Sequence, residues 1–283
     1  MHIMIRSHKT RTIRVAAAAA LAAGALALAG CASGPTVDSG DGGAAPAEPR
    51  VLKVAATTTP MPDVVLAAAE AIEAPYTIEL VEVADYVQPN TMLAAGELDA
   101  NFVQHPPFME EFNAGNNASL VAVEPVYLTV VGTYSSKHDS MADIPENGHI
   151  VVPQDLSNQA RALQMYADAG LIKLDPKVDK WDVTVADVTE NPKKLKFTEV
   201  DLMQLNAAYP EADGVFLHGT FARQLGLVPG DDAIAVEQDP QFAVSLVSRA
   251  DNQDSPEVKA LAKAFHSDEV RAVLEKYEVP AAF

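Results

Sequence analysis

The chain has 283 residues, 48% of them hydrophobic, and a formal net charge of −19. This length allows a large buried core in one or two domains. Because so acidic a surface repels phosphate backbones, the composition argues against nucleic acid as a partner.

The first 30 residues have the composition of a secretory signal peptide. An Ala/Leu-rich apolar run covers residues 15–29, and four basic side chains precede it: Arg6, Lys9, Arg11 and Arg14. The run is too short for a comfortable membrane span and suits the apolar region of a signal. It ends in Leu-Ala-Gly before Cys31, which matches a bacterial lipobox. We predict cleavage before Cys31, lipidation of its thiol, and a location on the extracytoplasmic face of the cell membrane.

Cys31 is the only cysteine of the chain, so no intrachain disulfide is possible. The residues that follow it, to residue 50, are rich in Gly, Pro, Ala, Ser and Asp and show no hydrophobic periodicity. Such a composition is typical of a flexible linker. We therefore predict that residues 31–50 tether the fold to its lipid.

From residue 51 onward, apolar strand-like runs alternate with helix-like segments, which predicts an α/β fold. The first part has predicted strands at 51–56, 77–83, about 99–105, 120–123 and 126–134, and predicted helices at 63–72, 91–96 and 107–114. A first lobe is expected to comprise residues 51–135 plus 240–283.

A polar stretch at 135–148 marks the expected entry into a second lobe, residues 136–239. Strands are predicted there at 150–153, 195–200, 214–217 and 233–236, with helices after Ser157 and Asp201 as N-caps and after His218. The chain then returns to the first lobe through a strand at 242–248 and closes with helices at 256–265 and 268–277.

The candidate ligand residues follow two successive predicted strands of the first lobe. Tyr86 comes after one strand, and Phe102 to His105 end the next. Strand ends are where ligands bind in open α/β sheets. Each residue alone is more often a core aromatic or a loop histidine, but together these side chains favour a site for a small polar ligand.

Motifs of cofactor or metal chemistry are missing from the sequence. It contains no Gly-rich phosphate loop, no HExxH and no GxSxG, and its histidines lack ligand spacing. We therefore expect neither a cofactor nor a structural metal. His105 as a catalytic base would define an enzyme, but no nucleophile or paired carboxylate accompanies it.

Six segments occur in an order known from one protein family: residues 85–90, 96–102, 104–105, 157–163, 170–174 and 190–196. With the lipobox, they make the chain from 51 to 283 resemble the NlpA family of methionine-binding lipoproteins. That family supplies the substrate-binding components of ABC importers, so the expected partners are a membrane permease and its ATPase. The resemblance implies capture of L-methionine.

The resemblance also implies a two-lobed, periplasmic-binding-protein-like (type II) fold with the ligand clamped between the lobes. It places Tyr86, Phe102 and His105 in the wall of the first lobe and Asn158, Arg161 and His218 in the second. The chemistry agrees with these roles. A guanidinium such as that of Arg161 binds a carboxylate through two parallel hydrogen bonds. An aromatic face contributes about 0.3–1.5 kcal/mol against a thioether.

Two segments depart from the family's pattern. Asp63 stands where the family usually has histidine after Thr-Pro-x-Pro, and His218-Gly219-Thr220-Phe221 replaces the usual Asn-Gly-Asn-Tyr. The first Asn of that run contacts the ligand in family members. Since an unperturbed histidine titrates near pH 6.5, acidification is expected to weaken binding through His218.

Three alternatives remain open at the level of sequence. The same binding role with another ligand would accept another amino acid, D-methionine or a Met-containing dipeptide. An enzyme would consume its ligand, whereas a binding protein returns it unchanged. A structural or adhesive lipoprotein would bind no free amino acid.

Overall fold

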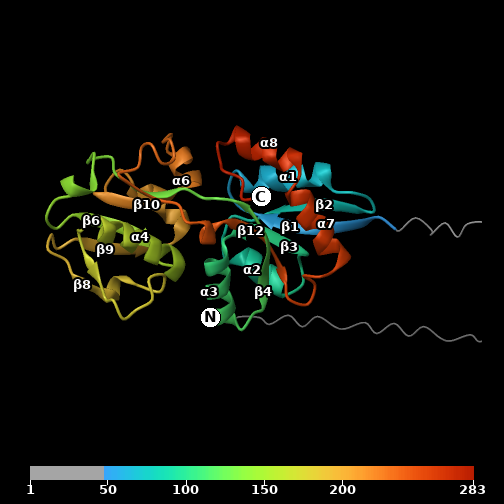
Figure 1. Ribbon diagram of the computed structural model, residues 1–283, viewed down its shortest axis with the longest axis horizontal. Coiled ribbons are helices and arrows are strands. Elements are labelled where there is room, and N and C mark those ends of the chain that lie inside the picture. Colours follow the sequence, from blue (N-terminus) through green and yellow to red (C-terminus); the bar gives the residue numbers. More distant parts are fainter. Residues whose placement is uncertain (1–47) are drawn as a thin grey trace, which may run out of the picture. The chain divides into compact units, whose positions relative to one another are not determined.

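The computed structural model describes residues 48–283. The predictions for the signal peptide, for lipidation of Cys31 and for all but the end of the tether lie outside the described residues. The described part contains two five-stranded sheets with helices packed around each of them (Figure 1). The predicted α/β fold class is confirmed.

The first sheet and its helices form lobe 1. Its strand order is β2-β1-β3-β12-β4, with β1 parallel to β2 and β3, and β12 antiparallel to β3 and β4. The bounds are β1 Arg50–Ala56, β2 Tyr76–Glu82, β3 Ala100–Gln104, β4 Leu120–Tyr127 and β12 Val244–Arg249. The helices are α1 Met61–Ala71, α2 Gln88–Ala94, α3 Pro106–Asn116, α7 Pro256–Phe265 and α8 Asp268–Lys276.

The second sheet and its helices form lobe 2, with strand order β11-β5-β10-β6-β9. The strands are β5 Val131–Tyr134, β6 His149–Pro153, β9 Lys196–Val200, β10 Gly214–His218 and β11 Ala235–Glu237. A separate antiparallel pair is formed by β7 Lys173–Leu174 and β8 Val188–Glu190, in a segment for which no strand was predicted. The helices are α4 Leu156–Asp168, α5 Leu205–Ala208 and α6 Gly219–Gln224, with short 3₁₀ turns at 141–143, 185–187 and 202–204.

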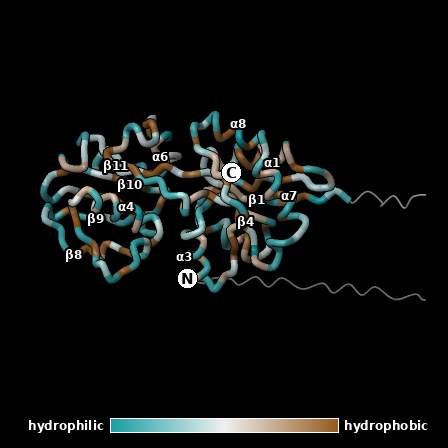
Figure 2. The backbone as a smooth tube through the Cα atoms, in the orientation of Figure 1, coloured by the Kyte–Doolittle hydropathy of each residue, from teal (hydrophilic) through white to brown (hydrophobic). Residues whose placement is uncertain are grey.

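Each lobe has its own apolar core because the strands bury apolar side chains under amphipathic helices. In lobe 1, Leu52 and Val54 of β1 pack with Leu261 of α7 and Leu274 of α8. In lobe 2, Ile150 of β6 belongs to a separate cluster around α4. Figure 2 shows hydrophobic segments along the strands and hydrophilic loops at the periphery. Several strand ends, by contrast, lie outside these two cores and can contribute side chains to a site.

Two chain segments connect the lobes, and the first differs from the prediction. β5 pairs with β10 and β11 in the second sheet, so the first crossover is residues 128–130, ahead of the expected boundary after residue 135. The apolar run at 126–134 hid this crossover because residues 128–130 are themselves apolar or half-buried. The second crossover, 238–243, contains the 3₁₀ turn Pro240–Phe242 and lies near the expected boundary at 240.

Helix α4 begins two residues earlier than the sequence indicated. Asp155 is the N-cap, and its carboxylate accepts a hydrogen bond from the backbone N–H of Asn158 at 2.9 Å, whereas Ser157 lies in the first turn. A side-chain oxygen at the N-cap satisfies a free N–H of the first helical turn. This start places Asn158 in the first turn and Arg161 one turn later.

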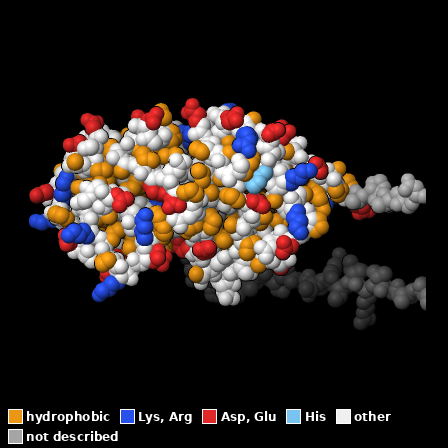
Figure 3. Space-filling view, in the orientation of Figure 1, with side chains coloured by type: hydrophobic (Ala, Val, Ile, Leu, Met, Phe, Trp, Pro, Cys, Tyr) orange, Lys and Arg blue, Asp and Glu red, His pale blue; other side chains and the backbone are white. Residues whose placement is uncertain are grey.

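The acidic side chains do not gather in one patch on the face shown in Figure 3. On the face shown in Figure 3, Asp and Glu side chains are spread over both lobes and alternate with Lys and Arg. In the part of the chain that the structure describes, no helix combines the length and the apolar character needed to cross a membrane.

Candidate functional site

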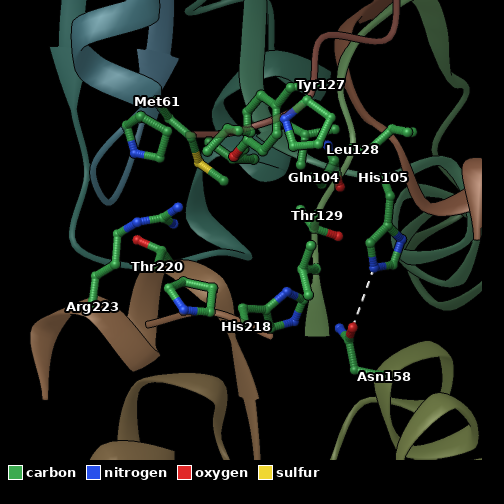
Figure 4. Close-up of a pocket in the computed structure, with 18 of the residues that line it drawn as sticks. Met61, Gln104, His105, Tyr127, Leu128, Thr129, Asn158, His218, Thr220 and Arg223 are labelled. Carbon is green, nitrogen blue, oxygen red and sulfur yellow. Dashed lines mark hydrogen bonds between the residues drawn. The ribbon is translucent and has the colours of Figure 1, made fainter. Parts of the chain in front are cut away.

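A cavity of about 80 Å³ lies between the two lobes. One water needs roughly 10–15 Å³ on this scale, so the cavity has room for a small ligand. Its wall combines strand ends of both sheets with the first crossover (Figure 4). The wall includes Met61, Tyr86, Val103, Gln104, His105, Tyr127, Leu128, Thr129, Asn158, His218, Thr220 and Arg223.

His105 ends β3 and caps α3. Its Nδ1 accepts a hydrogen bond from the backbone N–H of Phe108 at 3.3 Å, so the ring proton belongs on Nε2. Nε2 then donates to Oδ1 of Asn158, 3.3 Å away across the cavity. Burial and, after it, the charge of Arg161 lower the pKa of His105 to about 3. His105 is therefore a neutral donor that joins the two lobes.

Asn158 is fixed in orientation by its neighbours. Its Nδ2 donates to Asp155 at 2.9 Å, which leaves Oδ1 as the acceptor that faces His105. Nη1 of Arg161 lies 3.5 Å from the same oxygen. Asn158, which was predicted to line the lobe 2 side of the site, thus connects the cavity to Arg161 behind it.

Arg161 is completely buried and lies directly behind the cavity wall. Its Nε donates to Glu237 at 2.5 Å, and its guanidinium lies 4.1 Å from the ring centre of Phe242. Burial lowers the pKa of Arg161, and the carboxylate of Glu237 opposes that shift. Nη2 of Arg161 is buried without a hydrogen-bond partner among the described residues. This donor remains free for an anionic group.

His218 lies at the end of β10 and lines the cavity, as the sequence predicted for a residue opposite Asn158. Its ring contacts Phe216 and Phe221 edge-to-face, with centroids 5.3 and 6.1 Å away. Its Nε2 is buried and lacks a partner in the described part of the chain. Burial, followed by the charges of Arg161 and His105, holds the pKa of His218 well below 6.5.

The lowered pKa of His218 means that binding should weaken at a lower pH than the sequence predicted. Because His218 is neutral down to well below pH 6.5, ligand affinity is expected to stay level between about pH 8 and 6.5 and to fall only in more acidic solution. Calorimetric titration across this range checks the expectation, with His218→Asn as the control that cannot titrate. A loss of affinity between pH 8 and 6.5 that His218→Asn removes would contradict it.

Tyr86 and Tyr127 contribute two aromatic rings to the wall. The hydroxyl of Tyr86 hydrogen-bonds to Thr58 at 2.8 Å, and its ring meets Phe221 of lobe 2 edge-to-face at 6.3 Å. Met61 lies in the same region of the cavity (Figure 4). This end of the cavity therefore suits an apolar, polarisable group.

Two predicted site residues do not line the cavity: Arg161, which lies behind Asn158, and Phe102. Phe102 is fully buried in the lobe 1 core, where its ring meets Phe265 at 5.0 Å and Tyr127 at 5.8 Å. Its neighbours Val103, Gln104 and His105 all line the cavity, which meets the end of β3, whereas Phe102 lies further back along the strand and belongs to the core cluster.

Several residues of the site carried no recognisable signal in the sequence. Glu237 pairs with Arg161 from 76 positions away, and Phe242 packs on the same guanidinium from the second crossover. Thr129 places in the wall a buried hydroxyl that has no hydrogen-bond partner among the described residues. Of the two departures from the family pattern, Asp63 lies outside the wall and binds the hydroxyl of Tyr277 at 2.5 Å.

The donor set of the site does not resemble a metal centre. Within residues 48–283, no group of three or more His, Cys, Asp or Glu side chains is arranged to hold a metal ion. The wall offers the guanidinium of Arg223, the imidazoles of His105 and His218, the amides of Gln104 and Asn158, and aromatic rings, with the guanidinium of Arg161 behind Asn158.

A model of the NlpA lipoprotein family matches residues 52–282. The methionine-binding lipoprotein MetQ of Bacillus subtilis is 34% identical over 255 residues, which cover 88% of this chain and 90% of that protein. The D-methionine-binding lipoprotein MetQ of Escherichia coli K12 is 37% identical over 202 residues, 70% of this chain and 74% of that protein.

Solved structures show the same likeness. A nutrient-binding protein from Burkholderia cenocepacia, solved with methionine bound, matches with a TM-score of 0.78 and 33% identity over 82% of this chain and 100% of that chain. Lipoprotein Tp32 from Treponema pallidum matches with a TM-score of 0.78 and 30% identity over 82% of this chain and 99% of that chain.

Proposed function

The chain belongs to the NlpA lipoprotein family, and we propose that it binds methionine in the cavity between its lobes and delivers it to the permease of an ABC importer. The methionine-binding relatives confirm the predicted class of function, the solute-binding component of an ABC transporter. Such a protein is an extracytoplasmic, membrane-associated lipoprotein, and it captures its ligand without transforming it.

One observation carries the choice of ligand: buried polar atoms in and behind the cavity wall have no hydrogen-bond partner among the described residues. Nε2 of His218 and Oγ1 of Thr129 belong to the wall, whereas Nη2 of Arg161 and single oxygens of Asp155 and Glu237 lie behind it, around Arg161 and Asn158. Buried polar groups normally have hydrogen-bond partners, and each one left unmade costs about 1–3 kcal/mol. The set contains both donors and acceptors, which a ligand with a carboxylate and an ammonium group satisfies together.

In the proposed pose, the ligand carboxylate accepts from Nη2 of Arg161 beside Asn158. The ammonium group donates to the neutral ring of His218, whose free nitrogen accepts. The thioether then extends toward Tyr86 and Met61, where contact of sulfur with an aromatic ring adds about 0.3–1.5 kcal/mol. Phe102 has no part in this pose.

Because His218 replaces the family's asparagine, ligands closely related to L-methionine are also candidates. An amide offers a donor and an acceptor on one planar group, whereas a neutral imidazole carries them on opposite sides of a ring. D-methionine, another amino acid or a Met-containing dipeptide would meet that geometry differently. The enzyme alternative is disfavoured because His105, with a pKa of about 3 and its Nε2 proton directed at Asn158, is a poor base.

The proposal is tested by calorimetry on purified protein from which bound ligand has been removed. L-methionine and D-methionine are titrated in parallel, with leucine and a Gly-Met dipeptide as competitors. Saturable binding of methionine and its recovery unchanged are expected. Tight binding of leucine or the dipeptide together with no binding of either methionine isomer would refute methionine as the ligand.

The lipid anchor is a separate part of the proposal. Cys31→Ser is expected to leave the protein in the soluble fraction after detergent-free washing of membranes, because the substitution removes the thiol that receives the lipid. Fractionation of cells that express either form provides the measurement. Equal membrane retention of both forms, with no lipid on the parent protein by mass spectrometry, would contradict the anchor.

A further inference from the structure

A carboxylate of lobe 1 reaches the N-terminus of a helix in lobe 2, outside the ligand cavity. Glu111 lies on α3, and its two oxygens accept hydrogen bonds from the backbone N–H groups of Leu156 and Ser157 at 3.1 and 3.4 Å. These are the first two residues of α4. Glu111 does not belong to the cavity wall.

The contact is electrostatically favourable at that position. The first N–H groups of a helix have no partner within the helix, and the N-terminus carries partial positive charge. Asp155, the N-cap, accepts from the N–H of Asn158 and leaves those of Leu156 and Ser157 to Glu111. The helix of one lobe is thus completed by a side chain of the other.

The same two helices also meet at the cavity. His105 caps α3 and bonds to Asn158 on α4, which carries Arg161 one turn later. A movement that separated the lobes would therefore break the Glu111 contact and the His105–Asn158 contact together. Formation of the Glu111 contact brings the ligand-binding turn of α4 against lobe 1.

The contact also brings two acidic groups to one helix end. Burial raises the pKa of Asp155 to about 6, and the nearby charge of Glu111 adds to that shift. One oxygen of Asp155 is buried without a partner among the described residues. Mutual repulsion of the carboxylates opposes the attraction of Glu111 to the helix, which limits the strength of the contact.

We propose that Glu111 is an interlobe clasp: it binds the N-terminus of α4 in the closed protein and slows release of the ligand without touching it. This inference rests on the proposed function only in taking methionine as the ligand. Glu111 acts as a positioning residue because its effect passes through α4 to Asn158 and Arg161.

The test compares Glu111→Gln with Glu110→Gln. Glu110 is the exposed neighbour on the same helix, so the control changes charge equally without the interlobe contact. Glu111→Gln removes a charged partner from a helix N-terminus, and we expect about three- to tenfold faster methionine dissociation as a result. Stopped-flow measurements give this rate. Glu110→Gln is expected to leave the rate unchanged, and neither variant should lower the melting temperature of the ligand-free protein.

Two outcomes overturn the clasp. One is an unchanged dissociation rate in Glu111→Gln, and the other is a lowered melting temperature of the ligand-free protein that accounts for the faster release. Carboxyl NMR of Asp155 in the methionine-bound protein gives a second readout: Glu111→Gln should lower the pKa of Asp155, and an unchanged value would also refute the contact. Failure of the parent protein to bind methionine would instead count against the proposed function.

Discussion

Arg161→Ala is expected to weaken methionine binding by roughly 2–5 kcal/mol, the range for removal of one member of a buried charge pair. The side chain is fully buried, and its free Nη2 is the donor assigned to the ligand carboxylate. Arg161→Lys should recover only part of the affinity, because a single ammonium lacks the planar fork of a guanidinium. Calorimetry gives both affinities.

Arg161→Ala also leaves the carboxylate of Glu237 without its ion-pair partner, so a control is needed for this second effect. The double variant Arg161→Ala/Glu237→Gln removes the stranded charge and should regain stability without regaining affinity. Thermal unfolding without ligand separates these effects. Affinity equal to that of the parent in a folded Arg161→Ala protein would rule out the carboxylate contact.

Phe102→Ala is expected to lower the free energy of unfolding by about 3–5 kcal/mol, as other large core aromatics do when truncated. Its ring fills the lobe 1 core against Phe265 and Tyr127, so the loss is one of packing. Urea denaturation measures the change, and methionine affinity of the protein that remains folded should alter little.

Val103→Ala is the matched control for Phe102→Ala, since Val103 is the neighbour that lines the cavity. It should perturb affinity with a smaller loss of stability. The contradicting result would be a Phe102→Ala protein of nearly unchanged stability that has lost most of its methionine affinity. Phe102 would then contact the ligand, as the family resemblance implied.

The sequence predicted the α/β fold and the region of the site because strand ends and cap residues leave local signals. Tyr86 follows one predicted strand, His105 ends the next, and Asn158 and His218 lie at similar junctions of lobe 2. The structure brings all four to one cavity. The class of function followed from the order of linked motifs rather than from any single residue.

What the sequence missed depends on distance or on geometry within an element. Whether Phe102 or the residues after it line the cavity depends on where the cavity meets the end of β3, which a motif does not encode. The pairing of Arg161 with Glu237 joins residues 76 positions apart. The crossover at 128–130 was hidden because apolar residues continue through it from β4 into β5.

The pKa of His218 was also beyond the sequence. Its ordinary value follows from residue type, but the shift requires burial and the nearby charges of Arg161 and His105, all of which are tertiary facts. The departure from the family's asparagine therefore concerns hydrogen-bond geometry near neutral pH more than charge.

A crystal structure of the ligand-stripped protein crystallised with L-methionine tests the central claim most directly. The account predicts methionine in the cavity between the lobes, with its carboxylate at Nη2 of Arg161, its ammonium at the ring of His218 and its thioether beside Tyr86. An empty cavity with methionine bound elsewhere, or a carboxylate directed away from Arg161, would contradict it.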